Sequence, residues 1–269
     1  MRRRLDTELV RRGLADSRES ARLLVEQGAV LVSGSRADKP ARLVAPSDPV
    51  VVIGTDSPRF VSRGGHKLEA AIDRFSLVVA GRRCLDAGAS TGGFTDCLLR
   101  HGASTVVAVD VGHGQLDGRL RSDDRVEVRE RTNIRTLAAS AVGGEFDLLV
   151  ADLSFISLVT VAPVLVGSLA RGGADVVVLV KPQFEAGRTE VSRGKGVIRD
   201  PALRRAALEK VASAFASQGA TIMGAMASPL LGPAGNAEFL LHAVAHGAPA
   251  DSGTWADALD GAVAEAPDR

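Results

Sequence analysis

The chain has 269 residues, of which 45% are hydrophobic and 24% are charged, with a formal net charge of +1. This composition is that of a globular protein, and the length accommodates one large and one small domain. No apolar run approaches the roughly 20 residues that cross a membrane, and no cysteine and histidine spacing indicates zinc, so neither a membrane span nor a metal site is expected.

Charge is distributed unevenly along the chain. Residues 1–66 hold 12 Lys and Arg against 8 Asp and Glu, whereas the remainder holds 21 against 24. A basic module is a candidate for contact with a phosphate backbone. We therefore expect a small domain over residues 1–56, a polar linker containing Pro58 over residues 57–64, and a large domain over residues 65–269.

The small domain is predicted to hold two short helices followed by short strands. Asp6 and Asp16 are the expected helix caps, because each precedes a run with helical spacing of its apolar residues. Short apolar runs after the second helix indicate strands. The predicted elements are helices over 7–12 and 17–27 and strands over 29–32 and 50–53.

Residues 4–34 resemble the S4 RNA-binding module. The resemblance implies a small α+β domain that contacts structured RNA through basic side chains. Because the whole chain contains no tyrosine, we expect recognition of shape and phosphate rather than base stacking. A solvated helical face is the alternative role for any single arginine. The arginines expected to contact RNA are Arg3, Arg4, Arg11, Arg12, Arg18 and Arg22.

A glycine-rich loop opens the large domain. The stretch Cys84–Phe94, CLDAGASTGGF, predicts a buried strand that turns at its glycines into a helix over 94–100. Glycines let a backbone approach a ligand closely, and the helix N-terminus directs free N–H groups toward it. Asp110 ends the next predicted strand, 22 residues after Gly88. This is close to the roughly 20-residue spacing at which a carboxylate meets a ribose in nucleotide-binding folds.

The sequence of this loop favours S-adenosylmethionine over a dinucleotide. GASTGG lacks the G-x-G-x-x-G spacing, and Asp86 places a negative charge at the strand end, where a diphosphate would be repelled. S-adenosylmethionine has a sulfonium, an amino group and a ribose, but no phosphate. A glycine-rich turn in an unrelated α/β protein is the alternative.

Strand and helix patterns alternate through the rest of the chain, which predicts an α/β fold with a doubly wound parallel sheet. Continuous apolar runs such as VVVLV indicate strands buried on both faces. Cys84 and Cys97 fall in predicted buried elements and indicate a reducing, cytoplasmic setting. The predicted elements are strands over 125–131, 146–151, 175–180, 221–227 and 238–244, and helices over 67–75, 158–169 and 204–218, of which the helix over 158–169 is expected to be interrupted near its start by Pro163.

Four charged residues are expected at the carboxyl edge of this sheet, where ligands of open α/β sheets bind. Asp152 and Lys181 each follow a buried strand, Lys67 opens the helix before the first strand, and Glu238 begins the last strand. For each residue alone, a surface charge at the end of an element is the alternative. A lysine whose pKa is lowered by a neighbouring cation could remove the proton of a ribose hydroxyl. The residues alone do not separate Lys67 from Lys181 in this role.

Long blocks along nearly the whole chain resemble the TlyA, or haemolysin A, family of ribosomal RNA 2′-O-ribose methyltransferases. The blocks are VSRGGHKL, CLDAGASTGGFTDCLL, DVGHGQL, DLLVADLSFISL, LVKPQFEAG and SPLLGPAGNAEFLL. The resemblance implies a Rossmann-like, seven-stranded methyltransferase sheet beside the S4 domain. It implies S-adenosyl-L-methionine-dependent methylation of a cytidine ribose in 16S or 23S rRNA, or both, within the 30S or 50S subunit.

The resemblance also implies roles for individual residues. Lys67, Asp152, Lys181 and Glu238 would form a catalytic tetrad with Lys181 as the base. Asp110 would bind the cofactor ribose, and Phe155 would lie near its adenine or methionine end. The residues expected to bind the cofactor are Asp86, Gly88, Ala89, Ser90, Thr91, Gly92, Gly93, Phe94, Asp110, Val111, Asp152 and Phe155.

Two other functions compete with this one. A non-catalytic S4 protein that binds the ribosome would not need the four charged residues. A membrane-lytic haemolysin would need a spanning segment or a basic amphipathic helix with aromatic anchors, and the sequence shows neither. Both alternatives are therefore disfavoured.

Overall fold

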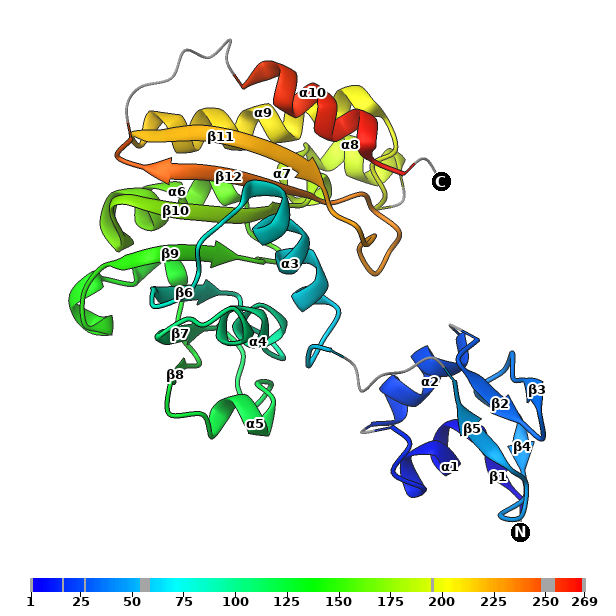
Figure 1. Cartoon of the computed structure of the whole chain (residues 1–269). Helices are drawn as coiled ribbons and strands as arrows, with labels where there is room; N and C mark the ends of the chain where they lie inside the picture. Colours follow the sequence, from blue (N-terminus) through cyan, green and yellow to red (C-terminus); the bar gives the residue numbers. More distant parts are fainter. Residues whose placement is uncertain are drawn as a thin grey trace. The chain divides into compact units, whose positions relative to one another are not determined.

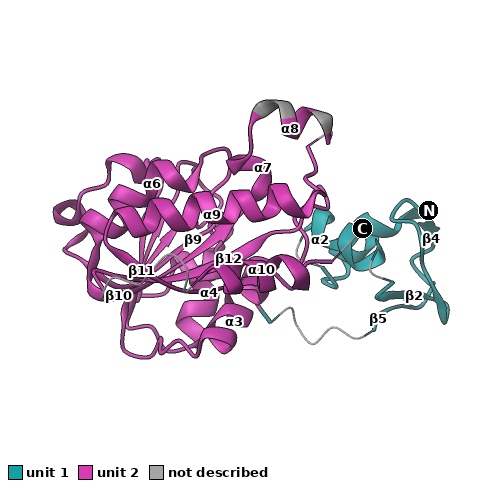
Figure 2. Cartoon of the chain, turned by 90° about the horizontal axis from the view of Figure 1, so that it is seen from above, with its two compact units in different colours: residues 1–59 teal, residues 60–269 magenta. Residues whose placement is uncertain are grey.

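The structure, a computed structural model, describes residues 2–15, 17–26, 28–53, 59–194, 196–247 and 255–267. Backbone contacts divide the chain into two compact units, Met1–Arg59 and Phe60–Arg269 (Figure 2). Each unit has buried hydrophobic clusters of its own. The two units are therefore described separately.

The N-terminal unit is a small α+β domain (Figure 1). Its elements are β1 (Arg3–Arg4), α1 (Leu5–Arg11), α2 (Arg18–Glu26), β2 (Val30–Val32), β3 (Ser35–Arg36), β4 (Leu43–Val44) and β5 (Val50–Val52). Strands β1 and β4 pair, and β3, β2 and β5 form a second antiparallel sheet in that order. Leu5 and Leu9 of α1 and Val25 of α2 pack on the buried faces of these strands.

The helix α1 begins two residues earlier than expected, so the prediction that Asp6 caps it is wrong. The N-cap is Arg4, which makes no side-chain cap hydrogen bond, and Asp6 is a fully buried residue of the first turn. The pairing of β1 with β4 carries Arg4 directly into the helix, and this tertiary contact overrides the local capping signal. The other expected cap, Asp16, lies outside the described residues.

The C-terminal unit contains a seven-stranded sheet in the order β11-β12-β10-β9-β6-β7-β8. The strands are β6 (Arg83–Ala87), β7 (Thr105–Val109), β8 (Val126–Arg129), β9 (Phe146–Ala151), β10 (Ala170–Val180), β11 (Ala220–Ala227) and β12 (Phe239–Ala245). Within the described residues of this sheet, β12 runs antiparallel to both of its neighbours, β10 and β11, and all other neighbouring strands are parallel. This arrangement confirms the predicted Rossmann-like methyltransferase sheet.

Helices cover both faces of the sheet (Figures 1 and 2). One buried cluster joins the sheet to α3, α4 and α5, and the other joins it to α6, α9 and α10. The helices are α3 (Gly64–Phe75), α4 (Gly93–Arg100), α5 (Gly118–Arg121), α6 (Leu158–Val164), α7 (Pro182–Glu185), α8 (Arg188–Arg193), α9 (Pro201–Ser217) and α10 (Ala256–Glu265). Short 3₁₀ turns occupy Ile134–Thr136 and Ala139–Val142.

The helix predicted over 158–169 is interrupted. The α-helix α6 ends at Val164, and Leu165–Leu169 continues as a single π-helical turn. Pro163 lies inside α6. Because proline has no N–H, it cannot donate the regular bond to the preceding turn, and a widened turn accommodates the defect.

The glycine at position 65 allows the first segment of the C-terminal unit to pack against α3. A Cβ atom there would lie 2.2 Å from Cγ of Phe60, whose side chain is buried. We predict that Gly65→Ala lowers the free energy of unfolding by about 1–3 kcal/mol, the usual cost of overpacking. Gly261→Ala is the matched control, because Gly261 lies inside α10 with open space around its Cα.

In the control, alanine's better helix propensity should raise the free energy of unfolding by up to about 1 kcal/mol. Denaturant unfolding of the full chain measures both variants. A Gly65→Ala variant as stable as wild type would show that Phe60 does not pack tightly on α3.

Candidate functional site

Four charged side chains meet at the carboxyl edge of the seven-stranded sheet as two ion pairs. Lys181 Nζ lies 2.5 Å from Asp152 Oδ1. Lys67 Nζ, from the first turn of α3, donates a hydrogen bond to Glu238 Oε2. The sequence placed all four residues at this edge, and the structure adds which carboxylate pairs with which lysine.

Strand register brings the two pairs together. Val180 of β10 lies opposite Phe239 of the antiparallel β12, so the next residue, Lys181, is beside the preceding one, Glu238. The predicted strand 238–244 begins one residue later, which leaves Glu238 just outside it. On the other side of β10, Val178 pairs with Ala151, and Asp152 follows at the end of β9.

The two pairs differ in their access to solvent. The two lysine side chains are equally buried, with 9% of Lys67 and 10% of Lys181 exposed, and the difference lies in the carboxylates, because Glu238 is 1% exposed and Asp152 is 25% exposed. Lys181 Nζ also donates to Ser154 Oγ at 3.0 Å. The Lys181 amine is thus held from two directions beside an open carboxylate, and the Lys67 pair is enclosed.

The glycine-rich loop between β6 and α4 lies beside these pairs. Gly88 has φ +86°, and a Cβ atom on it would lie 2.4 Å from the carbonyl oxygen of Asp152. Gly93 faces Ser62, and a Cβ atom placed on Gly93 would lie only 2.2 Å from Ser62 Oγ. These glycines are required by the close packing of neighbouring segments. Ser90 and Thr91, at the tip of the loop, are exposed.

Asp110 holds the loop in place from the end of β7. Its Oδ2 accepts a hydrogen bond from the Ser90 N–H at 2.9 Å, and its Oδ1 accepts one from the Gly112 N–H at 2.6 Å. Ser90 Oγ donates to Gln115 Oε1 at 3.2 Å. A hollow beside β7 is lined by these residues together with Ala89, Ala108, Leu116, Val128 and Glu130. A carboxylate retains further acceptor positions when two are occupied.

Asp86 is a buried carboxyl group with one unused oxygen. Its Oδ2 accepts a hydrogen bond from Thr95 Oγ1 at 2.6 Å, and its Oδ1 has no hydrogen-bond partner among the described residues. Burial, with a smaller contribution from the charge of Asp152, raises the pKa of Asp86 to about 7. An ordered cationic or N–H group of a ligand would satisfy the unused oxygen.

The remaining residues expected to bind the cofactor fall into exposed and buried groups. Phe155 is 92% exposed, has φ +63°, and its ring centroid lies 5.3 Å from that of Phe184. Val111 is also largely exposed, whereas the side chain of Phe94 is part of the core beneath α3 and α4. Phe94 can therefore offer a ligand little besides its backbone.

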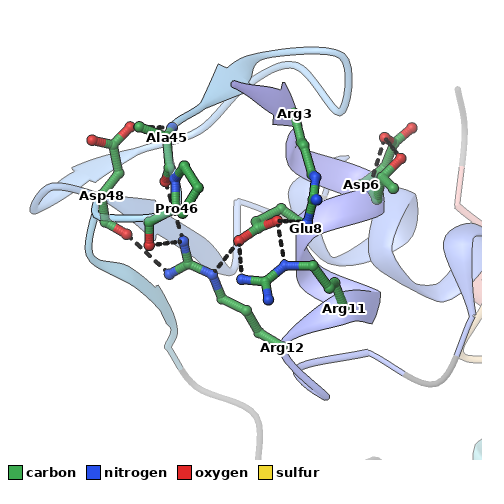
Figure 3. Close-up of polar contacts among 9 residues, drawn as sticks. Arg3, Asp6, Glu8, Arg11, Arg12, Ala45, Pro46 and Asp48 are labelled. Atoms are coloured by element: carbon green, nitrogen blue, oxygen red, sulfur yellow. Dashed lines mark hydrogen bonds and ion pairs between the residues drawn. The ribbon is translucent and has the colours of Figure 1, made fainter. Parts of the chain in front are cut away.

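The arginines of the N-terminal unit are organised around two buried carboxylates. Asp6 Oδ2 accepts hydrogen bonds from Arg4 Nη2 at 2.8 Å and Arg18 Nε at 3.2 Å. Glu8 accepts hydrogen bonds from Arg11 and Arg12 at 2.6–2.8 Å, and Arg3 lies 3.8 Å away (Figure 3). Arg22 is exposed and pairs with Glu26 at 3.8 Å.

Arg12 differs from the other five arginines. Its guanidinium also donates to the carbonyl oxygens of Ala45, Pro46 and Asp48 at 2.9–3.2 Å (Figure 3). Its side chain is 19% exposed, whereas the others are 44–61% exposed. Arg12 thus ties α1 to the loop between β4 and β5, which leaves few of its donors for a ligand.

Sequence reasoning missed several residues that hold the site. Ser154, two residues after Asp152, contacts Lys181. Asn236 joins the loop before β12 to another segment, because its Oδ1 accepts from the Ile198 N–H and its Nδ2 donates to the Gly196 carbonyl. Only the role of Glu8 had a sequence signal, its spacing of three and four residues from Arg11 and Arg12.

The chain matches two family models. The FtsJ-like methyltransferase model matches residues 60–244, and the S4 domain model matches residues 3–50. The fold and the paired charges at the sheet edge agree with these matches. They define a methyltransferase of the FtsJ-like class that carries an N-terminal S4 domain.

Curated relatives narrow this class. The chain is 55% identical to the 16S/23S rRNA (cytidine-2′-O)-methyltransferase TlyA of Mycobacterium tuberculosis over 241 aligned residues, and the aligned region covers 89% of each chain. It is 40% identical to Hemolysin A of Brachyspira hyodysenteriae, over 89% of this chain and 98% of that protein. A solved structure from Streptococcus thermophilus is 38% identical, with a TM-score of 0.77 over 98% of this chain and 94% of that one. The chain belongs to the TlyA family, as its sequence blocks indicated.

The buried carboxylates of the N-terminal unit predict its response to acid. Hydrogen bonds from Arg4 lower the pKa of Asp6 to about 2, and those from Arg11 lower the pKa of Glu8 to about 2. Unfolded carboxyl groups titrate near pH 4. The stability that these ion pairs contribute is therefore present above about pH 4 and lost as the pH falls toward about 2.

Amide hydrogen exchange of α1, measured from about pH 5 down to about pH 2.5 and corrected for intrinsic exchange, tests this expectation. Protection should decrease across this range in wild type and vary less in an Asp6→Asn, Glu8→Gln variant. An equal loss of protection in both proteins would contradict the assignment to these two carboxylates.

Proposed function

We propose that this protein transfers a methyl group from S-adenosyl-L-methionine to the 2′-hydroxyl of a cytidine ribose in ribosomal RNA. The observation that carries the proposal is the pair of lysine–carboxylate contacts at the carboxyl edge, directly beside the glycine-rich loop. The 55% identical relative from Mycobacterium tuberculosis is a 16S/23S rRNA (cytidine-2′-O)-methyltransferase, which supports the same reaction and extends it to 16S and 23S rRNA.

Residues of the glycine-rich loop and the ends of β6 and β7 would hold the cofactor, which supplies an electrophilic methyl group. The unused Oδ1 of Asp86 suits the cationic amino group of its methionine part. The carboxylate of Asp110, which keeps acceptor positions free at the end of β7, suits the hydroxyl groups of its ribose. The loop that leads into α4 lacks the glycine spacing of a phosphate-binding loop, which agrees with a ligand that lacks phosphate.

Lys181 is the proposed base. A ribose hydroxyl must lose its proton as it attacks the methyl group, and an unprotonated Nζ can accept that proton. The contacts with Asp152 and Ser154 fix Nζ, and the partial exposure of Asp152 leaves this pair open to a substrate. Lys67, enclosed with Glu238, would orient the neighbouring groups. The structure pairs each of the two lysines with its own carboxylate.

The S4 unit is proposed to bind the ribosomal RNA. Arg3, Arg4, Arg11, Arg18 and Arg22 have exposed guanidinium groups, and arginine is suited to phosphate because its fork of donors matches the phosphate oxygens. Arg12 is proposed to stabilise the unit instead. A lytic activity, which the name of the Brachyspira hyodysenteriae relative suggests, has less support, since no helix within the described residues is long and apolar enough to cross a membrane.

The role of Lys181 is testable with two substitutions. We predict that Lys181→Ala and Lys181→Arg both reduce methyl transfer by at least about 100-fold, the usual contribution of a positioned base. Arginine keeps the charge beside Asp152 but does not deprotonate. Transfer of labelled methyl to unmethylated 30S and 50S subunits, tested separately, measures the rate and identifies the labelled subunit.

Cofactor binding, measured by calorimetry, is the control for the folded state of both variants. Substantial activity in Lys181→Arg would show that Lys181 acts by its charge and not as a base. Absence of transfer to both subunits by wild type that binds the cofactor would contradict the proposed substrate.

Asp86 predicts a pH dependence of cofactor binding. Its pKa of about 7 means that the carboxyl group is largely neutral below pH 7, whereas a cationic amino group binds the ionised form better. Affinity should therefore rise as the pH increases from 6 to 8, with proton release on binding at the lower pH. Calorimetry in two buffers of different ionisation enthalpy measures both quantities. An Asp86→Asn variant should lose this dependence, and a dependence that persists would contradict the assignment.

A further inference from the structure

Two carboxylates of α1 are buried beneath the arginines of the S4 unit. Asp6 and Glu8 are both fully buried, although the guanidinium groups that they bind reach the surface. Residues two positions apart in a helix point in different directions. The two carboxylates therefore organise separate arginine clusters, which we call the Asp6 cluster (Arg4 and Arg18) and the Glu8 cluster (Arg3, Arg11 and Arg12).

Each cluster keeps an excess of positive charge. The Asp6 cluster holds two arginines and one carboxylate, and the Glu8 cluster holds three arginines and one carboxylate. The carboxylates lie at the buried end of each cluster, so the excess charge faces solvent. Surface ion pairs that simply neutralise a protein would instead match the charges one to one.

The hydrogen bonds leave one edge of the key guanidinium groups available. Arg4 and Arg11 both contact their carboxylates through Nε and Nη2. Within the described part of the chain, Nη1 of neither residue has a hydrogen-bond partner. A guanidinium held on one edge still presents donors on the other edge, in a fixed direction, to an incoming phosphate oxygen.

We propose that Asp6 and Glu8 are positioning residues for RNA: they hold the side chains of Arg4, Arg18 and Arg11 in the orientation that meets the phosphate backbone. This inference rests on the proposed RNA-binding function of the S4 unit. A free arginine on a surface loses rotamer freedom when it binds a phosphate. An arginine already held by a buried carboxylate has lost much of that freedom during folding.

Charge alone predicts the opposite change in RNA affinity when either carboxylate is removed. Replacing Asp6 or Glu8 with its amide removes one negative charge and so raises the net charge of the unit by one, and a more positive surface binds a polyanion more tightly. If the carboxylates position the arginines, the same replacement weakens binding. The two explanations thus predict opposite signs for one measurement.

The test measures the affinity of the full-length protein for purified 30S and 50S subunits at several salt concentrations. Asp6→Asn and Glu8→Gln should each weaken binding about fivefold to tenfold, from the lost ordering of two side chains. Glu8→Asp keeps the charge but withdraws the carboxylate, and it should weaken binding as well. Glu26→Gln is the control, because it removes an exposed acid beside Arg22 with no buried contact, and it should leave the affinity unchanged or slightly increased.

A double-mutant cycle separates positioning from a general loss of structure. If Asp6 acts through Arg4 and Arg18, the effect of Asp6→Asn should shrink in a background that carries both Arg4→Ala and Arg18→Ala, whereas a purely structural effect would persist in full. Equal or tighter binding by the amide variants, or strict additivity in the cycle, would overturn the proposal. Thermal melting shows which variants remain folded, and Glu8→Asp is the decisive variant if the amides unfold.

The same binding measurements test the proposed RNA-binding function of the S4 unit separately from the positioning role of Asp6 and Glu8. Arg4→Ala and Arg11→Ala should weaken binding if the S4 unit contacts the ribosomal subunits. Failure of these two variants to weaken binding would contradict the RNA-binding function itself. Weaker binding by the arginine variants together with unchanged binding by the acid variants would contradict only the positioning role.

Discussion

The pairing of β10 with β12 is the constraint that brings the four charged residues of the carboxyl edge together. Parallel strands deliver Asp152 and Lys181 to one edge, but only an antiparallel strand can begin there. β12 does so, and its register places Glu238 beside Lys181 and within reach of Lys67 on α3. Side chains alternate between the two faces of a sheet, so a slip of one residue would turn Glu238 away from Lys67. The approach of the Lys67–Glu238 pair to the Lys181–Asp152 pair therefore depends on the register of β12.

Buried carboxylates organise cations in both units of the protein. In the C-terminal unit, Glu238 is enclosed with Lys67, and in the N-terminal unit, Asp6 and Glu8 lie under arginines. Removing charges from water is costly, and such contacts add less to stability than their geometry suggests. Their main effect here is directional, because each carboxylate fixes the orientation of a long side chain that would otherwise be mobile.

Much of the fold was predictable because its signals are local. Apolar runs located the buried strands, and the first polar residues after them, Asp152 and Lys181, located the carboxyl edge of the sheet where the charged residues meet. The pairing of each lysine with its carboxylate was not predictable, since it depends on strand register between residues as distant as 67 and 238. Asp6 was misassigned for a similar reason. Its local pattern is that of a helix cap, and only the pairing of β1 with β4, which lies much later in the chain, places it inside the helix.

The contact between Gly88 and the carbonyl group of Asp152 has a consequence for how such an enzyme can change during evolution. The glycine belongs to the loop beside β6, and the carbonyl belongs to a residue of the charged tetrad, yet no side chain fits between them. Any residue larger than glycine would push the ends of β6 and β9 apart and displace both regions at once. The glycine-rich loop and the charged residues are thus coupled through this one backbone contact. Substitutions that alter either region during evolution must therefore keep glycine at position 88.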